Sequence, residues 1–102
     1  MKTKNIEIDE DAVQAFCQKH HVRRLALFGS VLREDFGPDS DVDVLVEFEP
    51  EARVGLIRFA SMENEFSELL GHRVDLNTVE SLSRYFRDEV LAEAEPLYDA
   101  AQ

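Results

Sequence analysis

Apolar residues recur at helical spacing near the start and in the middle of the chain. In residues 9–20, Val13, Phe16 and Cys17 fall on one helical face, and Asp9 or Asp11 is available as the N-cap. In residues 54–70 a longer stripe precedes Gly71, a typical C-terminal cap. The apolar positions of this stripe are Leu56, Phe59, Met62, Phe66, Leu69 and Leu70. Two amphipathic helices are therefore expected, each with one buried face.

A third amphipathic helix is predicted near the end of the chain, where Pro96 should help to end it. Its apolar positions are Leu82, Tyr85, Phe86 and Val90. Arg84 and Arg87 lie three residues apart and should share a face of this helix. Two interpretations stay open for them, which are ordinary surface pairing with Asp88 or Glu89 and a position facing a binding cleft.

Three short apolar segments predict strands at 24–28, 41–46 and 73–77. Between the first two, residues 31–35 can form a short helix and residues 36–40 are rich in turn-forming residues. The order of these elements predicts an α/β (α+β) fold in which helices pack on a small mixed sheet of three or four strands. The order of the strands in the sheet does not follow from the sequence. Because 102 residues leave room for one core, we expect a single domain over the whole chain.

The chain is strongly acidic, since 22 Asp and Glu against 11 Lys and Arg give a formal net charge of −11. Its 44% hydrophobic content is enough for a buried core. A chain of this charge repels phosphate backbones, so no binding to long nucleic acids is expected. Cys17 is the single cysteine and closes no internal disulfide. No apolar run resembles a signal peptide or a membrane span, and we expect a soluble, cytoplasmic protein without a membrane partner.

Two acidic residues interrupt the valine-rich segment at 41–46. Asp41 and Asp43 share one face of the predicted strand, with their Cα atoms about 6.6 Å apart. Their repulsion is on the order of 2 to 3 kcal/mol at an effective dielectric of about 20. Exposure at a strand end, a Ca²⁺ loop or bound Mg²⁺ would each relieve it. A Ca²⁺ loop of the EF-hand type is disfavoured, because Val44 and Pro50 stand where that loop has its glycine and its last ligand.

The residues before this acidic pair favour magnesium. Gly29-Ser30 follows the strand at 24–28, where glycine permits a tight turn, and backbone N–H groups with a serine hydroxyl can hold phosphate. Ten residues separate Ser30 from Asp41, which gives the pattern G-S-x10-D-x-D with both halves at strand ends. A Gly-Ser pair alone indicates only a turn, but its combination with the acidic pair is informative.

Phe28-Gly29-Ser30 followed by Asp41-Val42-Asp43 resembles the signature of the DNA polymerase beta-like nucleotidyltransferase superfamily. From about Asp9 to Tyr98 the chain resembles the minimal nucleotidyltransferase (MNT) antitoxins that are paired with HEPN-domain toxins. The further segments that carry this resemblance are residues 46–49, 69–76 and 84–89. One departure is Glu34, which stands where many relatives have glycine.

The resemblance implies a polymerase beta-like fold and a specific site. Gly29 and Ser30 would bind the triphosphate of ATP, with Arg33 as a weaker phosphate contact. Asp41 and Asp43 would hold two Mg²⁺ ions. Asp75 would be the third carboxylate of this metal-binding and catalytic set and would help to deprotonate the acceptor. The alternative for Asp75 is an exposed residue on an edge strand.

The implied reaction is transfer of AMP from ATP to a tyrosine hydroxyl of a partner HEPN ribonuclease toxin, which neutralises the toxin. Two alternatives stay open. In one, the protein is a binding module that neutralises its toxin by stoichiometric contact, and the acidic residues serve only the interface. In the other, it is an unpaired nucleotidyltransferase that acts on RNA ends.

Overall fold

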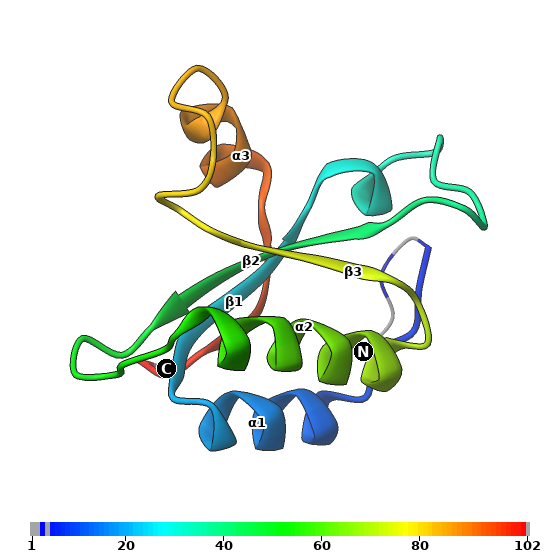
Figure 1. The fold of residues 1–102 in the computed structure, drawn as a ribbon. Coiled ribbons are helices and arrows are strands. Elements are labelled where there is room, and N and C mark those ends of the chain that lie inside the picture. Colours follow the sequence, from blue (N-terminus) through cyan, green and yellow to red (C-terminus); the bar gives the residue numbers. More distant parts are fainter. Residues whose placement is uncertain (1–2, 4, 102) are drawn as a thin grey trace.

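The computed structural model describes residue 3 and residues 5–101 and arranges them around one mixed sheet. The elements are α1 (Glu10–Lys19), β1 (Val22–Phe28), the 3-10 helix η1 (Gly29–Leu32), β2 (Val42–Phe48), α2 (Leu56–Leu70), β3 (Val74–Thr78), α3 (Arg87–Glu93) and β4 (Glu95–Asp99). The strands lie in the order β3-β2-β1-β4. β1 is antiparallel to β2 and to β4, whereas β3 runs parallel to β2. The α/β fold with helices packed on a small mixed sheet is thus confirmed (Figure 1).

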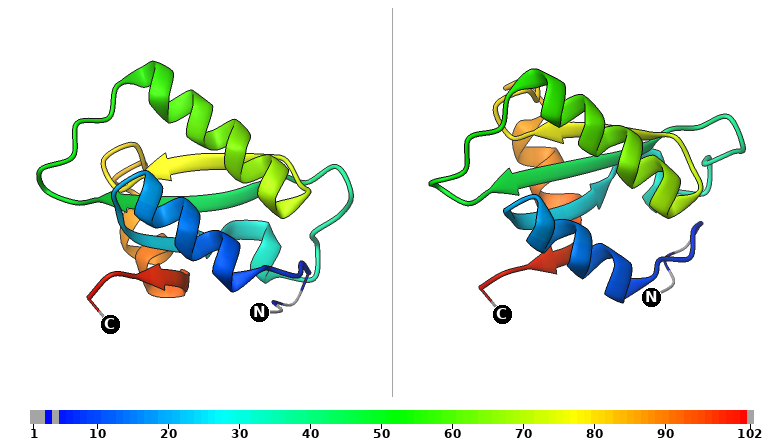
Figure 2. Two further views of the ribbon diagram at one scale, coloured as in Figure 1. Left: turned by 90° about the horizontal axis from the view of Figure 1, so that it is seen from below. Right: turned by 60° about the horizontal axis from the view of Figure 1, so that its bottom comes forward.

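The two faces of the sheet are covered differently. α1 and α2 lie side by side across one face, and α3 stands on the opposite face, as Figure 1 and the two views of Figure 2 show. The valines of β2 follow the predicted alternation, because Val42, Val44 and Val46 are all buried in the core. Since successive side chains of a strand point to opposite faces, Asp43 and Leu45 lie on the α3 face. The acidic residues of β2 and β3 therefore stay outside the main core.

The first two helices form as the apolar pattern predicts. The carboxylate of Asp9 caps α1 by accepting hydrogen bonds from two backbone N–H groups of the first turn. Phe16 of α1 packs against Phe66 of α2, with 4.8 Å between the ring centroids. Gly71 ends α2 in the left-handed conformation, with φ of 72°, which glycine adopts without strain. α1 and α2 pack against one face of the sheet and so fix the positions of β2 and β3, the strands that carry the acidic residues.

Leu56 departs from the predicted stripe of α2, because it is 89% exposed. The buried residues of this helix are Met62, Phe66 and Leu70, which lie four residues apart on one narrow stripe. Leu56 lies six residues before Met62, which turns it about 120° away from that stripe at about 100° per residue. The prediction that Leu56 belongs to the core is wrong.

The end of the chain also differs from the prediction. The last helix covers only Arg87–Glu93, and Tyr85 and Phe86 are 76% and 61% exposed in the turns before it. The residues after it form β4, which pairs with β1 at the edge of the sheet. Pro96 lies within this strand, and an edge strand tolerates its missing N–H.

The turn after β1 begins earlier than expected. The sequence predicts a short helix over 31–35, whereas η1 starts at Gly29 directly after the strand. The side-chain amide of Asn5 donates hydrogen bonds to the carbonyl oxygens of Val31 and Arg33, at 2.6 and 2.8 Å. The N-terminal segment thereby holds the turn in place.

In the part of the chain that the structure describes, no helix combines the length and apolarity needed to cross a membrane.

Candidate functional site

The turn at Gly29 lies directly against the Asp43 carboxylate. Gly29 has φ of 77°, a left-handed conformation that costs a residue with a Cβ about 1 to 2 kcal/mol. A Cβ at this position would collide with Oδ2 of Asp43 and would lie only 3.2 Å from its Cγ. Glycine is thus required here both for the backbone conformation and for the close approach of the aspartate.

The sheet register brings the predicted carboxylates together. Phe28, the last residue of β1, is the Cα partner of Asp43 on one side. Asp75 is its Cα partner on the other side, in the parallel pair of β2 and β3. Because paired residues on neighbouring strands point to the same face, Asp43 and Asp75 lie next to each other beside the Gly29 turn. Asp41 lies two residues before Asp43, just outside the strand, where it is exposed.

The charges of this cluster are poorly compensated at Asp43. Partial burial, together with the negative charges of Asp75 and Asp41, raises the pKa of the Asp43 carboxyl to about 6. The Arg33 guanidinium opposes this shift. Arg33 itself is 54% exposed in its side chain and lies 3.6 Å from a carboxylate oxygen of Asp35. The cluster is therefore a place where an added positive charge would be favourable.

The donor set fits a hard divalent cation, although it is not arranged to hold one as it stands. Three carboxylates offer the oxygen ligands that Mg²⁺ prefers, and Mg²⁺ takes one or two of them together with water and substrate phosphates. Oδ1 of Asp41, however, lies 2.9 Å from Nε of Arg73 in an ion pair. Within residues 3 and 5–101, no group of three His, Cys, Asp or Glu side chains is positioned to coordinate a metal ion. The side chains would therefore have to move closer together to hold a metal ion, and Oδ1 of Asp41 is already engaged by Arg73.

Glu93 of α3 is a site residue that the sequence pattern did not identify. Its Oε1 accepts a hydrogen bond from the backbone N–H of Gly29 at 3.4 Å and lies 3.9 Å from Nη1 of Arg33. These are two of the groups that were predicted to contact phosphate. Ser30, the third, follows Gly29 in η1 and is half-buried. No signal in the sequence could place Glu93 here, because its position depends on how α3 folds back over the sheet.

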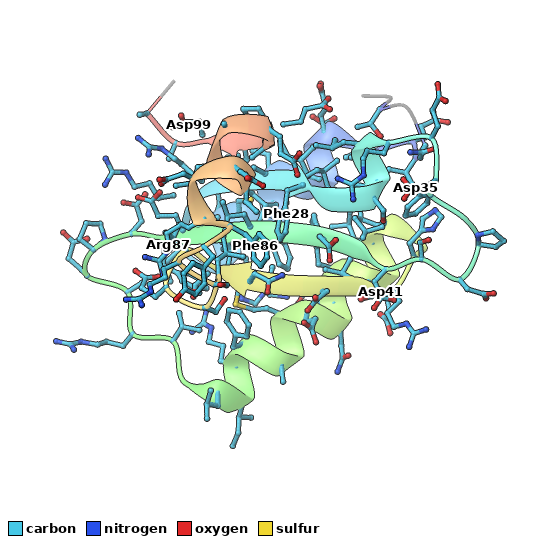
Figure 3. The ribbon with its side chains drawn as sticks, turned by 90° about the horizontal axis from the view of Figure 1, so that it is seen from above. Phe28, Asp35, Asp41, Phe86, Arg87 and Asp99 are labelled. Atoms are coloured by element: carbon cyan, nitrogen blue, oxygen red, sulfur yellow. The ribbon has the colours of Figure 1, made fainter. Side chains whose placement is uncertain are left out.

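The two arginines near α3 do not share a helical face, so that prediction is wrong. Arg84 lies in the turn before α3, where its guanidinium stands 5.2 Å from the ring centroid of Tyr85. Arg87 is the first residue of α3 and donates a hydrogen bond from Nη2 to the carbonyl oxygen of Leu82 at 3.1 Å. Figure 3 places Arg87 and Asp41 toward opposite ends of the sheet.

The chain is similar to known proteins over most of its length. The nucleotidyltransferase domain family matches residues 10–97. The protein adenylyltransferase MntA of Thermococcus cleftensis is 40% identical over 76 residues, which cover 74% of this chain and 75% of that protein. A solved structure of a protein assigned as a minimal nucleotidyltransferase is 38% identical, covers 85% of this chain and 87% of that one, and has a TM-score of 0.70.

A more distant solved structure shares the fold. It contains a tri-AMPylated Shewanella oneidensis HEPN toxin in complex with an MNT antitoxin. The matching chain is 20% identical, with a TM-score of 0.63, and the match covers 91% of this chain and 71% of that one. The family match spans most of the chain and contains the Gly29 turn together with all three aspartates. The chain belongs to the nucleotidyltransferase domain family, whose members transfer a nucleotide.

Proposed function

We propose that this protein is an antitoxin that transfers AMP from ATP to a tyrosine hydroxyl of a partner HEPN ribonuclease toxin in a Mg²⁺-dependent reaction. The observation that carries the proposal is the parallel register of Asp43 and Asp75 beside the Gly29 turn. With this register two carboxylates lie side by side next to the Gly29 turn, which in this proposal binds phosphate. We take the chain as a single nucleotidyltransferase domain.

Each predicted residue has a role in this proposal. The N–H of Gly29, the hydroxyl of Ser30 and the guanidinium of Arg33 bind the phosphates distal to the bond that breaks. Asp41, Asp43 and Asp75 are the residues that would hold two Mg²⁺ ions, and bound Mg²⁺ would supply positive charge to the reacting phosphate. Asp75 lies exposed on β3, the edge strand next to β2, and in this proposal it is the carboxylate nearest the acceptor. Its carboxylate would accept the proton of the acceptor hydroxyl.

The proposed reaction is a displacement at the α-phosphorus of ATP. The tyrosine oxygen of the partner forms a bond to the α-phosphorus, and the bond between that phosphorus and the oxygen bridging to the β-phosphate breaks. Pyrophosphate leaves and takes the electron pair, while the hydroxyl proton passes to the Asp75 side of the site. The groups around Gly29 hold the leaving pyrophosphate, so they are expected to act on nucleotide affinity and on departure of the product.

The partner is inferred from relatives and from the surface of this chain. The Thermococcus cleftensis relative is named a protein adenylyltransferase, and the Shewanella oneidensis complex pairs an MNT antitoxin with an AMPylated HEPN toxin. The net charge of −11 suits association with a basic, RNA-cleaving protein. Leu56 and Ile57 are 89% and 90% exposed at the start of α2, as is typical of a surface that contacts another protein.

A second candidate function is neutralisation by binding alone. It is favoured by the ion pair of Asp41 with Arg73, which engages one of the proposed metal ligands. In this alternative the acidic cluster contributes only to the interface with the toxin.

One experiment separates the two functions. The wild type and the Asp43→Asn variant are each expressed with the HEPN partner, and toxin neutralisation and AMP incorporation are measured together. Under the proposed function the Asp43→Asn variant loses toxin neutralisation and AMP incorporation. The Asp39→Asn variant, changed in the same acidic segment but outside the site, keeps both activities. Full neutralisation by Asp43→Asn without AMP incorporation would establish the binding module instead.

A further inference from the structure

Tyr85 is the tyrosine that this chain presents to solvent. The chain has two tyrosines, and Tyr98 is half-buried in β4. Tyr85 is 76% exposed and lies in the loop of residues 79–86 that connects β3 to α3. Its neighbours Arg84 and Phe86 are exposed as well. The phenolic hydroxyl of Tyr85 is therefore accessible to an enzyme that modifies tyrosine.

Arg84 places a positive charge beside the phenol group of Tyr85. Its Nη2 donates a hydrogen bond to the phenolic oxygen at 3.3 Å, and its guanidinium carbon lies 5.2 Å from the ring centroid. Joining AMP to a tyrosine oxygen creates a phosphodiester with a negative charge next to that oxygen. A guanidinium forms stronger hydrogen bonds to phosphate than a neutral donor does. Arg84 is thus in position to bind the phosphate of an AMP group on Tyr85.

The segment around Tyr85 is basic, whereas the proposed active site is acidic. Residues 81–87 hold two arginines and no acidic residue, although the whole chain has a net charge of −11. The acidic residues Asp88 and Glu89 follow only in the first turn of α3. Residues 34–43, which lead into the site, hold five carboxylates and no Lys or Arg. Because opposite charges attract across an interface, residues 81–87 of one copy suit the acidic site of another.

Tyr85 lies away from the carboxylates of its own chain. The loop that carries it leaves the sheet after Thr78, which is about 10 Å along β3 from Asp75. Figure 3 places Arg87, two residues after Tyr85, toward the end of the sheet opposite Asp41. Transfer from ATP on the same chain would require the loop to fold back across the sheet, whereas a second copy can present its loop directly.

We propose that Tyr85 of one copy accepts AMP from ATP bound to a second copy, so that the protein modifies itself in trans. The phenolic oxygen of Tyr85 forms a bond to the α-phosphorus, and the bond from that phosphorus to the oxygen bridging to the β-phosphate breaks. Pyrophosphate leaves with the electron pair, and the phenol proton passes to the Asp75 carboxylate of the second copy. The inference rests on the proposed function, because it uses the same reaction, and it adds an acceptor on this chain itself.

The purified protein incubated alone with Mg-ATP tests the acceptor. Intact-mass spectrometry should show the mass of an added AMP on the wild type and on Tyr98→Phe, the matched control, but not on Tyr85→Phe. Arg84→Gln should slow the modification by about fivefold, the effect of one partly exposed charge. A wild type that gains no mass, or a gain that persists in Tyr85→Phe, overturns the inference.

A mixture of two variants tests transfer between copies. Asp43→Asn keeps the acceptor tyrosine but lacks catalysis, and Tyr85→Phe keeps catalysis but lacks the acceptor. After both are incubated together with Mg-ATP, AMP should appear only on the Asp43→Asn chain, which the mass spectrum separates from the other. A mixture in which neither chain gains mass, although the wild type alone does, contradicts transfer in trans.

The HEPN partner separates the failure of this inference from the failure of the proposed function. Tyr85→Phe should modify that partner as fast as the wild type does, because Tyr85 lies outside the site that binds ATP. If the wild type modifies the partner but not itself, only the inference is wrong. If it modifies neither, the proposed function is wrong as well.

Discussion

Gly29 and Asp43 are in such close contact that a methyl group on Gly29 would overlap the aspartate carboxylate. The substitution Gly29→Ala therefore forces either the turn or the carboxylate out of place. We expect it to abolish AMP transfer and to lower the free energy of unfolding by about 1 to 3 kcal/mol, from the left-handed conformation and the clash together. Urea denaturation and a nucleotide-binding assay measure the two effects.

Gly71→Ala is the matched control for this substitution. Gly71 has nearly the same positive φ, 72°, but among the described residues nothing beyond its own chain neighbours lies within 4 Å of a Cβ built there. Its replacement should cost about 1 to 2 kcal/mol of stability and leave AMP transfer intact. If Gly71→Ala and Gly29→Ala reduced the transfer equally, the contact between Gly29 and Asp43 would have no specific role.

The Asp43→Asn variant should lose catalysis without losing the fold. Burial and the nearby charges of Asp75 and Asp41 raise the pKa of Asp43 to about 6, so the ionised carboxylate at pH 7 opposes folding. An amide of the same shape removes that repulsion. We expect AMP transfer to fall by a factor of about 100 or more, while the urea midpoint at pH 7 stays equal or rises. A lower midpoint would show that Asp43 supports the fold rather than the chemistry.

Glu93 should weaken nucleotide binding in the free protein, because its carboxylate lies on the Gly29 N–H and near Arg33. Glu93→Gln removes a negative charge from the phosphate site. We expect Mg-ATP and inorganic triphosphate to bind about fivefold more tightly, the effect of one partly exposed charge. Glu89→Gln, on the same helix, is the control and should change nothing. Weaker triphosphate binding by Glu93→Gln would mean that Glu93 positions the turn instead.

Cys17 should be protected from thiol reagents in the folded protein. Its side chain is fully buried, and burial raises the pKa of the thiol to about 12. Between pH 9 and about pH 12 the folded protein keeps the thiol proton, whereas the unfolded chain loses it. The contribution of the buried thiol to the free energy of unfolding is therefore complete below pH 9 and falls as the pH rises toward 12. A disulfide reagent at pH 8 should label Cys17 only after denaturation. Rapid labelling of the native protein would contradict its burial.

The sequence pattern predicted the core of the fold from Val13, Phe66 and the valines of β2, whose spacing matches the helix and strand periods. It was wrong at Leu56, which is apolar but exposed. It was also wrong at Tyr85 and Phe86, which are exposed because α3 begins only at Arg87 and is shorter than predicted. It also missed β4, because a proline in an edge strand looks like a helix terminator. In each case the outcome depends on contacts with distant parts of the chain.

For the site, the pattern supplied the residues but not their arrangement. Asp43 and Asp75 were both candidates, yet only the parallel pairing of β2 with β3 makes them neighbours. The contact of Gly29 with Asp43 likewise follows from the antiparallel pairing of β1 with β2. Glu93 and Arg73 were not candidates, because they reach the site through tertiary folding and carry no motif of their own.

The central claim is tested most directly by weighing the two proteins after reaction. The purified protein is incubated with Mg-ATP and the HEPN protein with which it is co-expressed, and both intact chains are measured by mass spectrometry. We predict that the partner gains one or more AMP units with the wild type and none with Asp43→Asn. A partner of unchanged mass, under conditions in which the two proteins bind each other, would contradict AMP transfer and leave stoichiometric binding as the function.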